Sequence, residues 1–181
     1  MFDIRKIQEQ VIFEAVKAAS DEETAQGIVH GASPQGTEDD ATWVKSTMAR
    51  LENRFDRATV RRIRMNCQCG YGMEEKLELV RELLRSSSSL AEFAGQAKAR
   101  AAGLSCVDGE LYLQFPYCPC PMLATVDRLD SGTWCQCTTG YSQVLFERAF
   151  GVRVEVELLK SVKMGDNHCL MRIVPLGPVW K

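Results

Sequence analysis

Hydrophobic residues recur at helical spacing through the first hundred residues of the chain. The first run places its members at steps of three and four, and it consists of Ile4, Ile7, Val11 and Ala15. Such spacing puts apolar side chains on one face of a helix. The same spacing returns over residues 44–55 and 73–84. The pattern therefore predicts a mainly helical part over residues 1–102.

Capping signals divide this part into separate helices. Ser20 followed by Glu23 has the form of a capping box, which predicts a second helix from about residue 21. Thr37 followed by three acids predicts the start of a third helix, because acids favour a helix N-terminus. Ser89 is expected to cap a last helix that runs through Ala102. The tail of the third helix is basic and contains Arg50, Arg54, Arg57, Arg61, Arg62 and Arg64.

After Gly103 the hydrophobic period changes to two, which indicates strands. Residues 111–115 alternate between apolar and polar side chains, and Pro116 ends the run. The alternation returns over residues 152–158, and the turn at 164–167 predicts a hairpin whose second strand holds Cys169.

Between these two strand regions the sequence predicts a strand end and a helix. Trp134 to Cys137 is expected to end a strand, and Thr138 or Thr139 to cap a helix that runs to Phe150. The fold class expected is α+β, with an N-terminal helical layer packed on an antiparallel sheet and a C-terminal helix followed by a β-hairpin.

Length and charge limit the class of protein. A chain of 181 residues is expected to form a single domain, mainly helical over 1–102 and strand–helix–hairpin over 103–181. The net charge of −2, with acids and bases interspersed, indicates neither a nucleic-acid nor a membrane partner. The N-terminus is charged from its third residue, without a signal peptide's apolar core, so a cytoplasmic location is expected.

Eight cysteines in a reducing compartment are expected to be metal ligands, nucleophiles or core residues rather than a disulfide framework. Six of them form Cys-x-Cys pairs, namely Cys67/Cys69, Cys118/Cys120 and Cys135/Cys137. Folding the terminal hairpin back on the helix is expected to bring Cys135, Cys137 and Cys169 together. Two short pairs from separate parts of a chain can hold zinc, so zinc ligands are predicted among Cys118, Cys120, Cys135, Cys137 and Cys169.

Other uses of the thiols remain open at this stage. Cysteines two apart in a strand share a face, so a pair can simply fill space in a core. An iron–sulfur cluster ranks below zinc, because the Cys-x-x-Cys-x-x-Cys run of bacterial ferredoxins is missing from the sequence. Disulfides within a pair are the weakest alternative, since Cα atoms about 6.6 Å apart lie at the upper edge of disulfide geometry.

A nucleophilic thiol is a further alternative. Cys137 is expected directly before a helix N-terminus, where the dipole lowers a thiol pKa, and Cys169 adjoins His168. The basic tail of the third helix is expected from the helix dipole alone, or else an arginine there holds a carboxylate near Cys67. Ligand-binding candidates are therefore Cys67, Cys69 and Arg64, with Tyr141 as either a core residue or part of a ligand cage.

The C-terminal residues carry a family resemblance. Cys135, Gly140-Tyr141, a helix, Gly151, a strand, and Gly165-Asp166 with Cys169 three residues later resemble the C-terminal half of the 4-vinyl reductase domain. This domain occurs in bacteriochlorophyll biosynthesis and in phenol-responsive transcriptional activators. The same ending is similar to that of the bacterial L-2-amino-thiazoline-4-carboxylic acid hydrolase-like proteins. The resemblance covers about 40 of the 181 residues.

The resemblance implies an α+β domain, often a homodimer, with a small-molecule pocket between sheet and helices. In the phenol sensors a zinc supports the pocket through cysteines that match Cys135 and Cys169. The sensors' other two ligands, a glutamate and a cysteine, fall at Leu158 and Ser161 in this chain. A zinc here is therefore expected to take ligands from Cys118, Cys120 or Cys137.

Two functions are predicted, and a purely structural role is the third possibility. The first is a small-molecule-binding module whose pocket is supported by a cysteine-bound metal, zinc, with a small apolar or aromatic ligand. The second is a thiol-dependent hydrolase that acts on a small sulfur- or nitrogen-containing substrate, with Cys169 or Cys137 as the nucleophile and an arginine on a substrate carboxylate. The third is a structural domain whose cysteines fill space.

Overall fold

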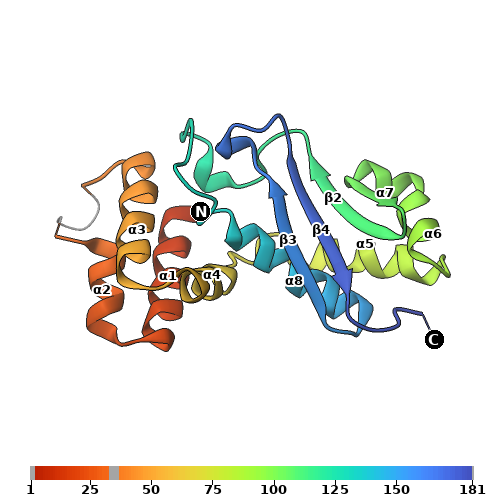
Figure 1. The fold of residues 1–181 in the computed structure, drawn as a ribbon, viewed down its shortest axis with the longest axis horizontal. Helices are drawn as coiled ribbons and strands as arrows, with labels where there is room; N and C mark the ends of the chain where they lie inside the picture. Colours follow the sequence, from red (N-terminus) through yellow and green to blue (C-terminus); the bar gives the residue numbers. More distant parts are fainter. Residues whose placement is uncertain (1–2, 33–36, 181) are drawn as a thin grey trace. The chain divides into compact units, whose positions relative to one another are not determined.

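Helices and one antiparallel sheet make up the computed structural model, which describes residues 3–32 and 37–180 (Figure 1). The helices are α1 (Ile4–Ala19), α2 (Glu22–His30), α3 (Asp40–Arg54), α4 (Arg57–Met65), α5 (Met73–Arg85), α6 (Leu90–Gly95), α7 (Ala97–Ala101) and α8 (Gln136–Phe150), with short 3-10 turns η1 (Pro121–Leu123) and η2 (Val162–Met164). The strands are β1 (Leu104–Val107), β2 (Glu110–Phe115), β3 (Val154–Lys160) and β4 (Cys169–Pro175). The predicted α+β class is confirmed.

The chain divides into two compact units, each built from three separate segments. The helical unit comprises Met1–Cys69, Cys118–Gly140 and Lys163–Gly165. The sheet unit comprises Gly70–Tyr117, Tyr141–Val162 and Asp166–Lys181. Two of the boundaries fall within α8 and η2. The expectation that residues 1–181 form a single domain stays a prediction.

In the helical unit, α1 packs against α2 and α4, and α3 packs against the same two helices. The turn η1 contacts both α1 and α3. The core of the unit is apolar and includes Ile12, Val16, Trp43, Leu51 and Leu123, all almost fully buried. The short segment 163–165 belongs here because the Leu129 amide donates to the Lys163 carbonyl.

Aspartates, rather than the hydroxyl residues expected from the sequence, begin the helices of this unit. Asp21 caps α2 and Asp39 caps α3, so the predicted caps Ser20 and Thr37 are wrong. Asp56 caps a separate helix, α4, where the sequence indicated one continuous helix with a basic tail. The carboxylate of Asp56 accepts hydrogen bonds from both the amide and the hydroxyl of Thr59, each at 2.9 Å. A carboxylate that binds two donors is a strong start signal, and here it interrupts the hydrophobic periodicity.

The sheet unit contains a four-stranded antiparallel sheet in the order β1-β2-β4-β3. The predicted terminal hairpin is confirmed as β3 and β4, with Cys169 as the first residue of β4. Strand β1 was not predicted. Its hairpin with β2 turns at Asp108 and Gly109, which both have positive φ, at 51° and 80°. An Asp-Gly pair with this backbone is a strong hairpin signal, so the sequence did carry it.

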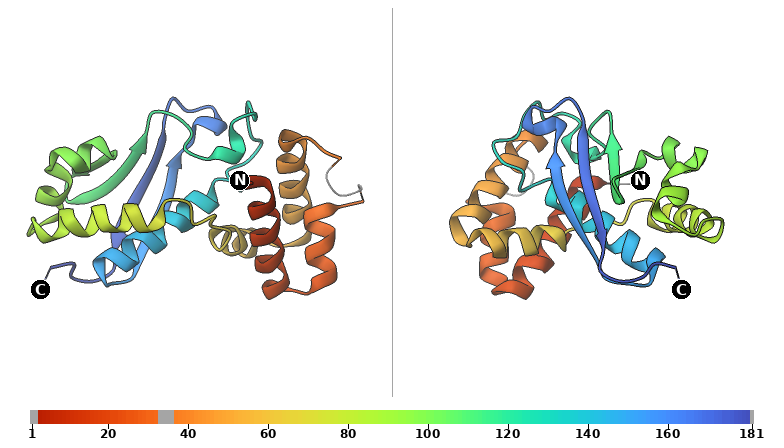
Figure 2. Two further views of the ribbon diagram at one scale, coloured as in Figure 1. Left: turned by 180° about the vertical axis from the view of Figure 1, so that it is seen from behind. Right: turned by 45° about the vertical axis from the view of Figure 1, so that its right-hand side comes forward.

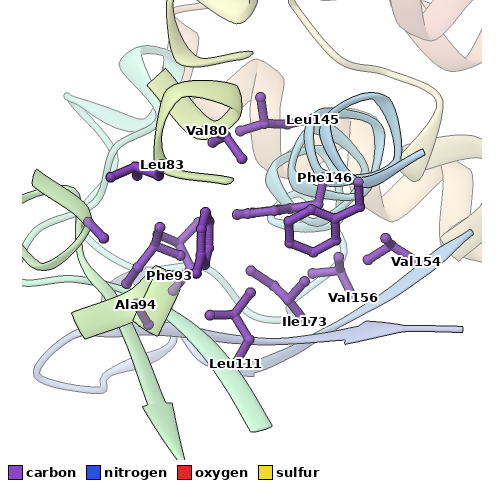
Figure 3. Packing of buried hydrophobic residues seen from close by; sticks show 14 of the residues in the cluster. Val80, Leu83, Phe93, Ala94, Leu111, Leu145, Phe146, Val154, Val156 and Ile173 are labelled. Atoms are coloured by element: carbon purple, nitrogen blue, oxygen red, sulfur yellow. The ribbon is translucent and has the colours of Figure 1, made fainter. Parts of the chain in front are cut away.

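Helices α5 and α8 lie on one face of this sheet (Figure 2). Figure 3 shows their side chains directed toward those of the strands: Val80 and Leu83 from α5, Leu145 and Phe146 from α8, with Leu111, Val156 and Ile173 opposite. Phe93 of α6 joins them and is fully buried. Ser89 caps α6 as expected, but the helix predicted through Ala102 is interrupted at Gln96.

The prediction of a strand end over Trp134 to Cys137 is wrong. Trp134 and Cys135 form a turn that leads into α8, which begins at Gln136, so Cys137 lies in the first helical turn rather than before it. Thr138 and Thr139 lie inside α8 and do not cap it. Over residues 3–32 and 37–180, no helix combines the length and the apolar character needed to cross a membrane.

Candidate functional site

A buried arginine lies at the centre of the candidate site. Arg64, in the last turn of α4, has an exposed fraction of 0%. Its Nη2 donates a hydrogen bond to the carbonyl oxygen of Trp134 at 2.8 Å. Its guanidinium carbon lies 4.4 Å from the centre of the Trp134 ring, which is a cation–π contact. Trp134 in turn packs edge-on against Trp43, with ring centres 5.7 Å apart, so the arginine rests on a rigid aromatic base.

The remaining donors of this pair are not used. Arg64 Nε and Nη1 and Trp134 Nε1 are buried, and none of them has a hydrogen-bond partner among residues 3–32 and 37–180. No ion pair joins Arg64 to an aspartate or glutamate within the same residues. Burying a charge is costly unless it is paired and hydrogen-bonded. The site therefore has a surplus of positive charge and of N–H donors.

Four thiols lie near this arginine or near one another. Cys67 and Cys69 follow α4, Cys120 precedes η1, and Cys137 lies in the first turn of α8. Arg64, Cys120, Cys69 and Cys67 all act electrostatically on the Cys137 thiol, so the structure brings these side chains into one neighbourhood. The Cys67 thiol donates a hydrogen bond to the Ile63 carbonyl at 3.1 Å. We call this group of four cysteines the thiol cluster.

Burial dominates the acid–base behaviour of two of these thiols. Desolvation raises the pKa of Cys137 from 9.0 to about 12, although the Arg64 charge acts in the opposite direction. Desolvation likewise raises the pKa of Cys67, again against the influence of Arg64. The lowering of the Cys137 pKa that the sequence led us to expect is therefore wrong, because burial, the largest influence on this thiol, disfavours the thiolate.

Gly140 allows helix α8 to pack closely against the end of helix α4 in this site. A Cβ atom on Gly140 of α8 would overlap the carbonyl oxygen of Met65 and lie 2.7 Å from its Cα atom. The absence of a side chain at Gly140 thus lets the first turns of α8, with Cys137, approach the end of α4, with Arg64. The sequence did not indicate this contact, because it joins Met65 and Gly140, which are 75 residues apart in the chain.

The other predicted site residues have different surroundings. Cys118 is half-buried and Cys135 is buried, and both belong to the helical unit. Cys169 and Tyr141 belong to the sheet unit. Cys169 is buried, and its sulfur accepts a hydrogen bond from the Val162 amide at 3.5 Å. The expected meeting of Cys135 and Cys137 with Cys169 stays a prediction.

Tyr141 is held by contacts within the sheet unit. Its hydroxyl donates to the Tyr71 carbonyl at 2.9 Å, and the Lys76 ammonium lies 4.8 Å from the centre of its ring. It also packs against the apolar core of the sheet unit. These contacts agree with the core alternative for Tyr141, while its role as a ligand residue stays a prediction.

The thiol cluster brings cysteines into one neighbourhood, but a metal site also requires donor atoms within bonding range of one ion. Within the described part of the chain, no three side chains among His, Cys, Asp and Glu lie close enough together to hold one metal ion. His168, the neighbour of Cys169, contacts the Asn167 side-chain oxygen through its Nδ1 atom. The predicted zinc site and its ligands stay a prediction.

The fold and the site together define an α+β protein with a buried arginine beside a cluster of thiols. The chain belongs to DUF6144, a family of unknown function, whose model matches residues 1–180. A comparison with curated proteins finds none that matches this chain. The resemblance to the 4-vinyl reductase domain and to the hydrolase-like proteins is not tested by these findings and stays a prediction.

Proposed function

We propose that this protein is a small-molecule-binding module, and that its site lies in the helical unit around Arg64 and the thiol cluster. One observation supports this most strongly. Arg64 is fully buried, yet two of its three guanidinium nitrogens have no hydrogen-bond partner in the described residues. A buried polar group without a partner costs about 1–3 kcal/mol, and more when it is charged. A bound molecule that supplies acceptors would remove this cost.

We also propose zinc as the metal that supports the site. Thiolates are preferred zinc ligands, and four of them make a complete tetrahedral set, so the donor chemistry of the thiol cluster fits zinc. The positions fit only after movement, because no three donors lie within range of one ion across residues 3–32 and 37–180. Zinc would cross-link the separate segments that carry the cysteines. Cys118, Cys135 and Cys169 are the alternative ligands expected from the sequence.

Metal analysis tests the zinc proposal. Protein purified without chelator is expected to contain about one zinc per chain, since one tetrahedral site takes one ion. Its thermal stability should fall when a chelator removes the ion. Cys120→Ser should reduce the zinc content, while Cys106→Ser, a half-buried thiol on β1, should leave it unchanged. Cys135→Ser and Cys169→Ser in the same assay decide whether the ligands predicted from the resemblance take part. A metal-free protein with unchanged stability under chelator would contradict the proposal.

A thiol-dependent hydrolase is the second candidate, and one observation favours Cys169 within it. The Val162 amide points its N–H at the Cys169 sulfur, which places a hydrogen-bond donor beside this candidate nucleophile. Cys137 is less suited, because burial keeps its thiol protonated. Under this alternative, iodoacetamide at neutral pH should modify Cys169 faster than the half-exposed Cys106. Equal or slower modification of Cys169 would count against a nucleophilic role.

Two further expectations belong to the proposal. A homodimer is implied by the family resemblance, and light scattering after size-exclusion chromatography measures it directly. A cytoplasmic location is proposed from the sequence, and fractionation of cells that express the tagged protein tests it. Neither nucleic acid nor a membrane is proposed as a partner.

A further inference from the structure

The unused hydrogen-bonding groups of Arg64 and Trp134 share one chemical property: all of them are donors. Arg64 Nε, Arg64 Nη1 and Trp134 Nε1 are buried without a partner in the described residues, as are Gln8 Oε1, Gln136 Oε1 and Arg172 Nε elsewhere, and the first three belong to two side chains in direct contact. No carboxylate of the described residues forms an ion pair with this guanidinium. A group that matches them must accept hydrogen bonds and carry negative charge.

We infer that the molecule bound in the helical unit carries a carboxylate group, which pairs with the Arg64 guanidinium through the free donor of Nε or of Nη1, next to the unpaired Trp134 side chain. This inference rests on the proposed small-molecule function and names the class of ligand, but it does not depend on zinc. The sequence allowed either an apolar ligand or an acid held by an arginine, and the structure favours the acid.

Arg50 provides an internal comparison in the same unit. Its Nε donates to the Ile28 carbonyl at 2.8 Å, and its Nη2 donates to the Thr47 hydroxyl at 3.1 Å and to the Val29 carbonyl at 3.4 Å. Protein groups thus satisfy Arg50, which ties α3 to α2. Arg64 is more deeply buried, donates to the Trp134 carbonyl through Nη2, and leaves Nε and Nη1 without a partner in the described residues. An arginine that only connects two helices uses its donors within the protein, as Arg50 does. An arginine that binds a ligand keeps donors free for it, as Arg64 does.

One positive charge also selects among anions. A carboxylate carries a single negative charge and two acceptor oxygens, which suits one guanidinium and a neighbouring indole N–H. A phosphate dianion would leave a second negative charge buried without a partner, which is unfavourable. The structure therefore favours a monocarboxylate over a phosphate ester.

Matched pairs of acids and amides test the inference on the full-length protein as purified. Acetate, butyrate and benzoate cover a range of sizes, and acetamide, butyramide and benzamide have nearly the same shapes without the charge. Binding is measured by isothermal titration calorimetry and by the shift in melting temperature. At least one acid is expected to bind ten times or more tightly than its amide, and inorganic phosphate should not compete with it.

Two variants connect this preference to Arg64. Arg64→Met should weaken binding of the preferred acid at least tenfold, because it removes the charge and its donors. The variant is expected to fold, since methionine is a long apolar side chain and the substitution removes a buried charge that forms no ion pair with the described residues. Arg50→Met should leave the affinity within twofold of the wild type, although it loses its hydrogen bonds to α2.

Each contrary result has a distinct meaning. If an amide binds as tightly as its acid, and Arg64→Met leaves that binding unchanged, the carboxylate inference is wrong while the small-molecule function stands. If phosphate binds tightly and depends on Arg64, the anion is a phosphate and the inference is wrong in its class. If none of the acids or amides binds, both the inference and the small-molecule function lose their support, whatever the zinc content.

Discussion

The reactivity of Cys137 follows from its burial. Its pKa of about 12 leaves roughly one thiol in ten thousand ionised at pH 8, and the thiolate is the species that reacts with alkylating agents. In metal-free native protein we expect iodoacetamide to modify Cys137 at least ten times more slowly than Cys106. Peptide mass spectrometry over time measures both rates in one sample, and repeating it in urea should make them similar. Faster modification of Cys137 in the native protein would restore it as a candidate nucleophile.

Gly140 allows the closest backbone approach within the site. In Gly140→Ala the new methyl group would overlap the Met65 backbone, which cannot rotate away as a side chain can. We expect a loss of about 2 kcal/mol or more in the free energy of unfolding, in the upper part of the range for overpacking. Urea unfolding followed by circular dichroism measures this loss.

Gly27→Ala is the matched control for that substitution. Gly27 lies in α2 of the same unit and has nothing within 4 Å of the position of an added Cβ atom. Because alanine is the better helix former, this variant should gain about 0.5–1 kcal/mol. If both substitutions have the same sign and size, the contact between Gly140 and Met65 is not as close as the structure has it.

Single residues were the hardest feature to predict from the sequence. Arg64 was one of six arginines in a basic stretch, and only its closeness to Cys67 in the sequence made it a candidate for ligand binding. Its burial depends on Trp134, which is 70 residues away. The Cys-x-Cys spacing did indicate sites of interest, and all four cysteines of the thiol cluster come from such pairs. Spacing alone could not show which pairs meet.

At the scale of elements, Asp56 separates α3 from α4. Hydrogen bonds from Thr59 hold the pKa of Asp56 below its usual value of 3.8. A carboxylate whose pKa is lower in the folded than in the unfolded protein stabilises the fold above the unfolded pKa. That stabilisation is lost as the pH falls through the folded pKa. Asp56→Ala should therefore lower the urea midpoint at pH 7, and the difference from wild type should narrow as the pH is lowered to 2.

Asp56→Asn separates the cap from its charge. Asparagine keeps an oxygen that accepts from the Thr59 amide, so this variant should retain most of the stability at pH 7. Its unfolding should also respond less to acid than that of the wild type. If Asp56→Ala unfolds like the wild type at pH 7, the aspartate does not determine where α4 begins.

Hydrophobic periodicity predicted elements well and their boundaries less well. It gave the helices near residues 4–15 and 73–84, the alternation gave β2 and β3, and the turn at 164–167 indicated β4. It missed the division between α3 and α4, because the apolar spacing continues across Asp56 and only the capping hydrogen bonds mark the break. It also assigned Trp134 to Cys137 to a strand, since aromatic and small residues in a short stretch do not distinguish a strand from a turn.

The whole molecule shows an arrangement that no local pattern could indicate. Each unit takes segments from both halves of the chain, so the division into residues 1–102 and 103–181 does not coincide with the units. The helical unit needs residues 118–140 because Trp134 underlies Arg64 and Gly140 meets Met65. Such pairings depend on tertiary packing between distant segments. A one-dimensional pattern records only neighbours within a few residues, so it predicts helices and strands but not their grouping.

Whether the two units unfold together tests the single-domain prediction. The chain has three tryptophans, and Trp43 and Trp134 belong to the helical unit while Trp180 belongs to the sheet unit. In a Trp180→Phe background, fluorescence therefore reports unfolding of the helical unit alone. Phe146→Ala removes a fully buried ring from the core of the sheet unit, which should cost about 3–5 kcal/mol.

If residues 1–181 fold as one cooperative domain, Phe146→Ala should shift the fluorescence transition of Trp43 and Trp134 to lower urea, although neither tryptophan lies in the sheet unit. The shift should equal the one measured by circular dichroism, which reports both units. Val107→Ala, at an exposed position on β1, should shift neither signal and serves as the control. A fluorescence transition that stays in place while the circular dichroism signal splits into two steps would show that the units unfold independently. In that case the binding site around Arg64 would have a stability of its own, and damage to the sheet unit would leave it intact.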